Sequence, residues 1–142
     1  MTDNKITKSD KAPEPVGAYA HARKEGKLLF LAGMGPRKKG TKEIPGVTLD
    51  QKGKIVDYDI AKQTISVFEN LKTVLEDAGS KWENIIDVTV FLTNMDNDFK
   101  TFNNLWAQYF SDPNNLPTRT TVEINKLPTP IAIELKVIAK VG

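Results

Sequence analysis

Two charged residues near the end of the chain, Arg119 and Glu134, have side chains that could do chemistry together. A guanidinium group can hold a carboxylate through two parallel hydrogen bonds, and a glutamate can take a proton from a water molecule. The pair therefore suits a site that binds a small carboxylate and moves a proton beside it. Spacing alone leaves a second interpretation open, in which the two side chains form an ordinary ion pair on a solvated sheet face.

Two segments of alternating apolar and polar residues carry these side chains. Residues 119–124 and 131–137 alternate with a period of two on either side of a proline-containing connection, which predicts two β-strands. In the first strand the row that contains Val122 is expected to face the core, so that Arg119 points the other way. In the second strand the apolar row is expected to face the core and Glu134 to point away. The pattern thus predicts both charged side chains on the non-core face.

The rest of the chain is expected to consist of strands and amphipathic helices. Polar residues and prolines predict a flexible arm over residues 1–15, followed by a single domain over residues 16–142. The expected elements are a hairpin (16–23 and 28–32), an exposed loop (37–53), a short strand (54–58), a helix (59–78), a strand (86–92) and a second helix (94–110). This order predicts an α+β fold with both helices packed on one face of a sheet. The other face is a candidate for oligomerisation.

Aromatic residues recur at helical spacing in the second predicted helix. Phe99, Phe102, Tyr109 and Phe110 fall on one stripe of that helix. Such a stripe is expected to pack into the core rather than to serve as a stacking platform for a ligand.

Composition excludes several kinds of chemistry. The 142 residues include no cysteine, which removes disulfides, thiolate nucleophiles and cysteine-ligated metals. The only histidine is His21, so a multi-histidine metal site is excluded and histidine-based acid–base catalysis is not expected. A net charge of +2 does not predict a nucleic-acid partner. Neither a signal peptide nor a membrane-spanning run is present, which predicts a cytoplasmic protein.

The motifs that surround the two charged residues resemble one known family. Pro117-Thr-Arg-Thr-Thr-Val-Glu-Ile, followed by Ile133-Glu-Leu, resembles the signature of the RidA (YjgF/YER057c/UK114) family, and Val16-Gly-Ala-Tyr and Leu31-Ala-Gly extend the resemblance over nearly the whole chain. The resemblance implies a chorismate-mutase-like fold and a homotrimer whose sheets form a central barrel. It also implies active sites between subunits, and a last strand that is inserted elsewhere in the sheet.

The same resemblance implies an activity and assigns residues to it. Family members hydrolyse enamine or imine intermediates such as 2-aminoacrylate to a 2-keto acid and ammonia. By this resemblance Arg119 binds the substrate carboxylate and Glu134 positions or activates the attacking water. Tyr19 and Asn103 line the cleft, and the backbone of Gly33 lies near the substrate. No metal and no organic cofactor is expected, because the imine is already an electrophile.

Two departures from the family pattern bear on the substrate. This chain has Ala32 where many members have serine, and Thr121 where many have cysteine, so both positions are expected to affect substrate choice. Gly33-Met-Gly-Pro-Arg-Lys and Lys126-Leu-Pro-Thr-Pro further resemble the 2-aminomuconate deaminase branch, which acts on a dicarboxylate. That resemblance predicts that Arg37 holds a second carboxylate. The alternative is a solvated basic loop.

Two other functions remain open at this stage. One is a non-catalytic trimer that binds small carboxylates or acts as a chaperone. The other is the ribonuclease or translation-inhibiting activity that has been attributed to some family members. The low net charge, and the lack of both a catalytic histidine and a metal–carboxylate cluster, argue against the second.

Overall fold

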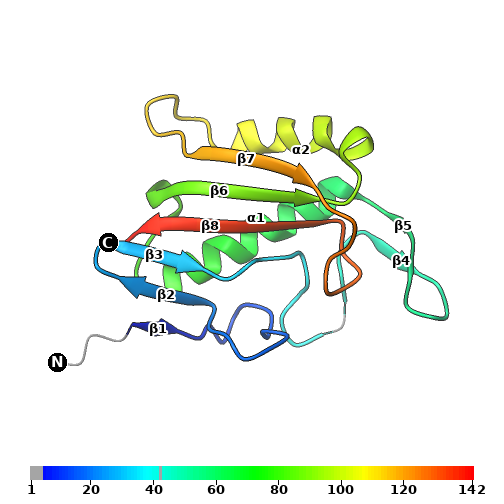
Figure 1. The fold of residues 1–142 in the computed structure, drawn as a ribbon, viewed down its shortest axis with the longest axis horizontal. Coiled ribbons are helices and arrows are strands. Elements are labelled where there is room, and N and C mark those ends of the chain that lie inside the picture. The colour runs from blue at the N-terminus through cyan, green and yellow to red at the C-terminus, as the bar shows by residue number, and fades with distance from the viewer. Residues whose placement is uncertain (1–4, 42) are drawn as a thin grey trace.

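A mixed β-sheet forms the centre of the molecule (Figure 1). The computed structural model describes residues 5–41 and 43–142, and in this part of the chain six strands follow the order β1-β2-β3-β8-β6-β7. Their bounds are β1 (Ile6–Thr7), β2 (Ala22–Glu25), β3 (Leu28–Leu31), β6 (Ile85–Leu92), β7 (Thr118–Glu123) and β8 (Ile133–Lys140). Although β8 is last in the chain, it lies between β3 and β6 and runs antiparallel to both. β7 pairs with β6 in parallel and forms one edge, so β7 and β8 are not a hairpin.

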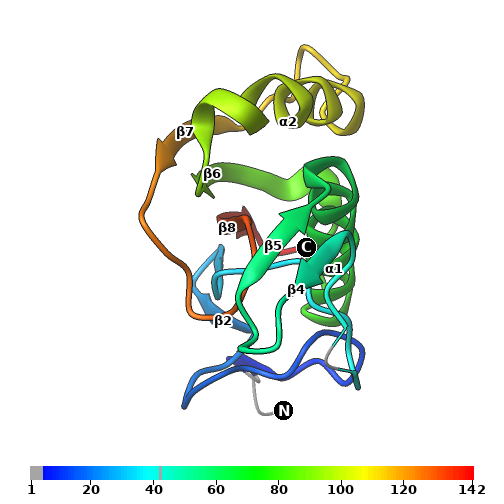
Figure 2. The same cartoon turned by 90° about the vertical axis from the view of Figure 1, so that its right-hand side faces the viewer.

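Both α-helices of the described residues pack on the same face of this sheet (Figure 2). α1 spans Ile60–Asp77, and the side chain of Asp59 caps its N-terminus by accepting a hydrogen bond from the backbone N–H of Lys62. α2 spans Met95–Tyr109 and is capped in the same way by Asn94. A short 3₁₀ helix, η1 (Trp82–Asn84), leads into β6. The predicted α+β arrangement is therefore confirmed.

The core lies between the helices and the sheet, as the apolar periodicity predicted. Phe68 and Leu71 of α1 are buried against alternate residues of the central strands. Fully burying one such side chain stabilises the fold by roughly 1.5–3 kcal/mol. The strand residues that face the helices include Leu29, Leu31, Val88, Val90, Ile133, Leu135 and Val137.

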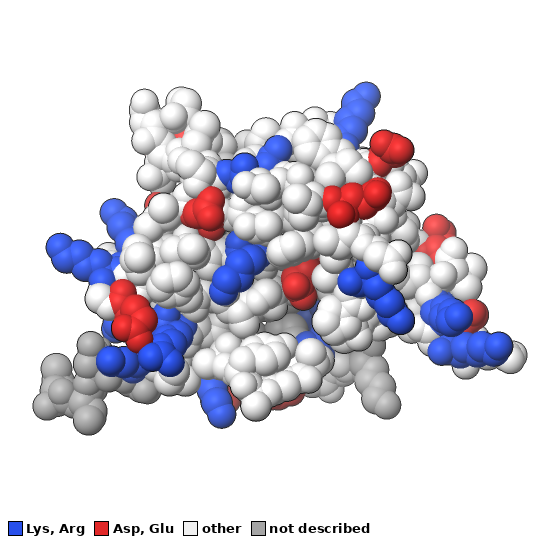
Figure 3. All heavy atoms as spheres, viewed as in Figure 1, with Lys and Arg blue, Asp and Glu red and all other residues white. Residues whose placement is uncertain are grey.

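The opposite face of the sheet is not covered by a helix, and it carries a mixture of side chains. Phe30 and Ile138 are paired there on β3 and β8, and Phe91 and Glu134 are paired on β6 and β8. Acidic and basic side chains are scattered over this face, which is hollowed near its centre (Figure 3). A face that is partly apolar and not covered within the chain is suited to contact with another molecule.

Two segments differ from the sequence predictions. The loop expected over 37–53 contains β4 (Val47–Leu49), which pairs with β5 (Ile55–Tyr58) in a separate hairpin. The flexible arm predicted over residues 1–15 is packed onto the fold from residue 5 onward, because β1 pairs with β2 and Ser9 and Ala12 are buried. The remaining arm residues, 1–4, lie outside the described part. In the described residues, no helix is both long and apolar enough to span a membrane.

Candidate active site

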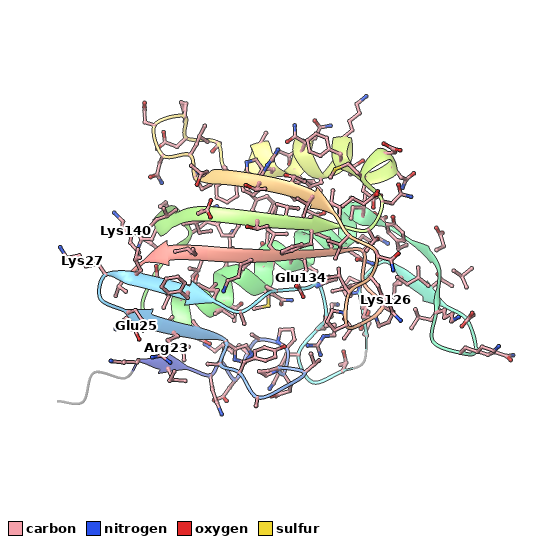
Figure 4. The ribbon with its side chains drawn as sticks, viewed as in Figure 1. Arg23, Glu25, Lys27, Lys126, Glu134 and Lys140 are labelled. Atoms are coloured by element: carbon pink, nitrogen blue, oxygen red, sulfur yellow. The ribbon has the colours of Figure 1, made fainter. Side chains whose placement is uncertain are left out.

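Glu134 lies near the beginning of β8, next to a small cavity on the uncovered face (Figure 4). The cavity is lined by the N-terminal arm, by the segment that follows β3 and by the connection before β8. It brings together four of the residues predicted from sequence, namely Tyr19, Gly33, Arg37 and Glu134. It encloses only about 60 Å³, well below the roughly 300–1,000 Å³ of typical ligand pockets. The cavity alone is therefore smaller than a typical ligand site.

Gly33 allows the carboxylate of Glu134 to lie where it does. A Cβ atom at position 33 would stand 2.7 Å from Oε2 of Glu134 and 2.9 Å from its Cδ. Both distances are shorter than real Cβ contacts, so only glycine leaves room for the carboxylate in this position. The glycine predicted near the substrate therefore shapes the position of the glutamate.

The carboxylate of Glu134 is half-buried beside the cavity. Burial raises the pKa of Glu134 above its ordinary value because it penalises the charged form. Lys136 lies two residues further along the same face, but its amino group donates to the backbone carbonyl of Leu31. Within the described ranges, no side chain or backbone group donates a hydrogen bond to Glu134 and no cation pairs with it. A carboxylate in this state can act as a general base closer to neutral pH than an exposed one.

The predicted orientation of Arg119 is wrong. Arg119 pairs with Val88 of β6, and Thr121 pairs with Val90. Both valines are buried against the helices, and residues paired across neighbouring strands point to the same face. Arg119 therefore lies on the helix side of the sheet, whereas Glu134 lies on the uncovered side. The row with Val122 occupies the uncovered face instead.

Aromatic rings of α2 explain why a charged side chain is on the helix side. The guanidinium carbon of Arg119 lies 4.8 Å from the ring centre of Trp106, 5.6 Å from Phe102 and 5.8 Å from Phe99. A guanidinium is attracted to aromatic faces, and β7 is an edge strand from which the group still reaches solvent. The aromatic stripe of α2, predicted only as core, thus also forms a platform under Arg119.

The guanidinium of Arg119 is available for an anion. Burial lowers the pKa of Arg119 from its ordinary value. No carboxylate in the described part of the chain forms an ion pair with Arg119, and its guanidinium group lies against the three aromatic rings. An arginine side chain has five N–H donors, so these donors can bind a carboxylate in the bidentate geometry.

The two other predicted site residues lie on the side of Arg119. Thr121 follows Arg119 by two residues on β7 and shares its face. Asn103 follows Phe99 by four residues on α2 and precedes Trp106 by three, so it is on the helix side that carries the aromatic platform. The predicted site is therefore divided into two groups, one around Glu134 and one around Arg119.

The strand register gives the separation of these two groups. Arg119 pairs with Val88, and Val88 pairs with Val137, whereas Glu134 lies three residues from Val137. Because β6 lies between β7 and β8, the two backbones are about 10 Å apart, and the offset along the strands adds about 10 Å in the perpendicular direction. The side chains also point to opposite faces. A carboxylate of a few carbon atoms cannot contact both groups within one chain.

Sequence reasoning missed two features of this region. Trp106 forms the closest ring contact of Arg119, and it was not among the residues of the predicted aromatic stripe. His21 borders the cavity of Glu134, where both of its ring nitrogens are hydrogen-bonded. As for metals, the described residues contain no group of three or more histidine, cysteine, aspartate or glutamate side chains that could hold an ion.

Comparison of the sequence with known proteins shows the family to which this chain is related. The family model described as Endoribonuclease L-PSP matches residues 9–141. A RutC family protein of Pyrococcus horikoshii is 41% identical over 92% of this chain and 93% of its own. Reactive Intermediate Deaminase A, chloroplastic, of Arabidopsis thaliana is 31% identical over 94% of this chain and 64% of its own.

A solved structure agrees with these relatives. The crystal structure of E. coli TdcF with bound serine superimposes with a TM-score of 0.81 at 31% identity, covering 98% of this chain and all of that one. The chain therefore belongs to the Endoribonuclease L-PSP family, which includes the RidA and YjgF proteins, and its sheet with two helices is the chorismate-mutase-like fold of that family. The resemblance to the RidA family that was inferred from the motifs is confirmed.

Proposed function

We propose that this protein is a cofactor-independent deaminase that hydrolyses a carboxylate-bearing enamine or imine to a keto acid and ammonia. The observation that carries this proposal is the pair of half-buried, unpartnered groups, the guanidinium of Arg119 and the carboxylate of Glu134. The first is suited to a substrate carboxylate and the second to a water molecule. A relative named Reactive Intermediate Deaminase A supports the same activity at the level of the family.

The chemistry needs only these two groups and a water molecule. Arg119 holds the carboxylate, and its positive charge favours attack on the neighbouring imine carbon by withdrawing electron density. An enamine first takes a proton from water on its β carbon and becomes the protonated imine. Glu134 takes a proton from the attacking water as the water oxygen bonds to the imine carbon, which gives a neutral tetrahedral carbinolamine. Glu134 then gives this proton to the amino nitrogen, and the C–N bond breaks as the hydroxyl oxygen of the carbinolamine forms the new C=O bond and returns its proton to Glu134, which releases it to solvent. The products are a keto acid and ammonia.

We further propose that the site forms between two copies of the chain, in a homotrimer. The register separates Arg119 from Glu134 by strand β6 and by the thickness of the sheet, so one chain cannot offer both groups to a small substrate. A second copy that brings its Arg119 group to the cavity of Glu134 would complete the site. The small volume of the cavity and the uncovered face beside it favour this arrangement.

The proposed substrate class is a 2-amino or 2-imino acid. Serine, which is bound in the TdcF structure, has a carboxylate and an amino group on neighbouring atoms, as does 2-aminoacrylate. A dicarboxylate such as 2-aminomuconate is the second candidate. Arg37 borders the cavity of Glu134, and one of its NH₂ groups donates to the backbone carbonyl of Glu14 at 2.8 Å, which leaves its other donors for a second carboxylate.

The direct test measures ammonia released from enzymatically generated 2-aminoacrylate and, in parallel, from 2-aminomuconate. Wild type is compared with Arg119→Ala and with Glu134→Gln, which keeps the shape of the side chain but cannot accept the proton. We expect release by wild type and a loss of at least about a hundredfold in either variant. No acceleration by wild type on either substrate would refute the deaminase and favour a carboxylate-binding protein.

Mixed oligomers test where the site lies. Arg119→Ala and Glu134→Gln chains, each inactive alone, are co-expressed with different tags and the hybrid oligomers are purified. If the site takes Arg119 from one chain and Glu134 from its neighbour, about one third of the sites in each hybrid trimer have both groups. If both residues act within one chain, mixing restores nothing.

The family description provides a second candidate, an endoribonuclease. Both nitrogens of the only histidine, His21, are occupied by backbone groups, so it is not free for RNA cleavage. The net charge of +2 provides little attraction for phosphates. Incubation of the purified protein with labelled single-stranded RNA separates the candidates: cleavage that survives Glu134→Gln would support a nuclease distinct from the proposed site.

A further inference from the structure

His21 connects the N-terminal arm to the sheet through both nitrogens of its ring. The ring is buried, with 4% of the residue exposed. Nδ1 accepts a hydrogen bond from the backbone N–H of Ser9 at 2.9 Å, and Nε2 lies 2.7 Å from the backbone oxygen of Pro13. A backbone N–H can only donate and a carbonyl can only accept. The ring is therefore neutral and carries its proton on Nε2.

Ser9, the partner of Nδ1, organises the arm. Its hydroxyl oxygen accepts hydrogen bonds from the backbone N–H groups of Lys11 and Ala12, both at 3.2 Å. The same hydroxyl donates to the carboxylate of Asp77 at the end of α1. Ser9 is therefore fixed at three points besides its bond to His21. Because Ser9 is held in this way, its backbone N–H cannot easily turn away if Nδ1 of His21 gains a proton.

The arm fixed in this way forms one wall of the cavity next to Glu134. Residues 13–16 border the cavity opposite Gly33 and Glu134. Two further bonds hold this wall. Arg37 donates to the backbone carbonyl of Glu14 at 2.8 Å, and the backbone N–H of Val16 donates to the hydroxyl of Tyr19 at 3.1 Å. The position of the arm thus determines how the cavity is closed.

We infer that His21 is a positioning residue that holds residues 9–16 as the wall of the cavity when it is neutral, and that protonation of its ring releases this wall. In the imidazolium form Nδ1 also carries a proton, and that proton would face the N–H of Ser9, so a hydrogen bond becomes a contact between two donors. Histidine is the side chain that changes charge between about pH 5 and 8. We expect the arm to be docked while the ring is neutral and released once the ring is protonated.

The surroundings of the ring do not compensate a positive charge on it. Across the described residues, no carboxylate forms an ion pair with His21. Glu14 pairs with Lys39, and Asp77 is held by Ser9 and lies 4.0 Å from the amino group of Lys11. His21 borders the cavity of Glu134 and also a second, shallower hollow beside the N-terminal arm. The charged or titratable groups that line these two spaces are Lys8, Asp10, Glu14, Tyr19, Arg37, Lys39 and Glu134.

The test compares wild type with His21→Gln and His21→Ala, all without affinity tags. Glutamine offers an acceptor and a donor in place of the two ring nitrogens but takes no proton in this range, whereas alanine offers neither. Hydrogen exchange of the backbone amides of residues 9–16, corrected for the intrinsic effect of pH, is followed at about pH 8 and about pH 5. We expect wild type to lose protection at the lower pH, His21→Gln to keep it, and His21→Ala to lack it at both.

Two results would overturn the inference. If His21→Gln loses protection at low pH as wild type does, another group releases the arm. If His21→Ala keeps the protection of wild type, His21 does not hold the arm. Because the chain has a single histidine, ¹⁵N spectroscopy observes the ring without overlap, and a neutral ring protonated on Nδ1 at the upper pH would also contradict the geometry. Circular dichroism establishes that each variant is folded.

Only the catalytic consequence of this inference depends on the proposed function. If the cavity serves the deaminase, His21→Ala should lower kcat/KM by about tenfold, mainly through KM, because the wall encloses the substrate. His21→Gln should keep most of the kcat/KM that His21→Ala loses. As the pH is lowered, kcat/KM of His21→Gln should also fall less than that of wild type. Protein without deaminase activity but with the expected exchange pattern would refute the proposed function and leave the role of His21 intact.

Discussion

The contact between Gly33 and Glu134 allows a sharp prediction, because one added carbon atom changes the position of the proposed base. In Gly33→Ala the new Cβ would lie 2.7 Å from Oε2 of Glu134, and ordinary contact begins at 3.4 Å, so the carboxylate has to retreat by about 0.7 Å. The carboxylate is the end of a flexible side chain beside a cavity, so it can move. The backbone of residue 33 does not need to change.

The size of the expected effect follows from this displacement. Misplacing a reacting group by about 1 Å can cost on the order of a hundredfold in rate, so a retreat of about 0.7 Å should lower kcat by roughly ten- to a hundredfold. Crowding costs about 1 kcal/mol of folding stability, while replacing glycine by alanine restricts the unfolded chain and offsets about half of that or more. The melting temperature should therefore move by no more than about 3 °C.

The assay is steady-state ammonia release combined with thermal unfolding, and Gly35→Ala is the matched control. A Cβ at position 35 would lie equally close, at 2.7 Å, to a methyl group of Ile131 in the same cavity, but it would not touch the carboxylate. We expect this control to lose stability with a much smaller loss of kcat. In a double-mutant cycle, Gly33→Ala should add nothing to Glu134→Gln. An equal loss of kcat in that background would refute the reasoning.

Substitutions at four positions test the two halves of the site. Arg119→Lys keeps the charge but not the fork of donors, so kcat/KM should fall by at least about tenfold in steady-state assays. Trp106→Leu removes the closest ring, worth about 0.5–2 kcal/mol, and should raise KM several-fold, with Trp106→Phe restoring part of it. Because burial raises the pKa of Glu134, the unfolded chain releases this proton more easily, and wild type loses stability as the pH rises through the interval between the two values. Glu134→Gln should therefore melt higher than wild type at about pH 8 and similarly at about pH 4, which calorimetry measures. Arg37→Ala should weaken turnover of a dicarboxylate and spare 2-aminoacrylate, whereas equal loss on both would exclude a second carboxylate site.

Periodicity was enough to predict most of the secondary structure. The helical stripe around Phe68 gave α1, and alternation gave β6 and β8, because each of these elements buries one face in a single core. The hairpin of β4 and β5 was partly missed. Its strands are short and mostly exposed, so no apolar alternation marks them.

The face of β7 could not be predicted from its own residues. Threonines occupy both rows of this strand, so the apolar contrast depends on Val122 alone. The orientation is decided by the aromatic rings of α2, which favour the guanidinium of Arg119 over an aliphatic side chain at this edge. Those rings come from a different part of the chain, and their position depends on the whole fold. Local alternation therefore predicted the strand but not which of its two rows of side chains faces the helices.

The arrangement of the site has the same origin in contacts between distant segments. Tyr19, Gly33 and Glu134 come from three parts of the chain and meet because β8 is inserted beside β3. No local pattern determines the strand order, and the resemblance to a family predicted only that the last strand is inserted elsewhere in the sheet. The hydrogen bonds of His21 could not be predicted because its partners, Ser9 and Pro13, lie in a segment whose composition predicts a loose arm.

The two departures from the family pattern fall in different halves of the site, and this bears on how a substrate is chosen. Ala32 borders the cavity of Glu134, where a serine would add a hydroxyl group close to the attacking water. Thr121 lies on the face of Arg119, so its hydroxyl is on the side where the proposed function places the substrate carboxylate. Polar contact is thus moved from the side of the water to the side of the carboxylate. Restoring the serine with Ala32→Ser adds a hydroxyl group to the cavity that also contains Arg37, so in the ammonia-release assay it should change the ranking between a monocarboxylate and a dicarboxylate. Thr121→Val lies beside the carboxylate that both substrates share and should change their rates similarly.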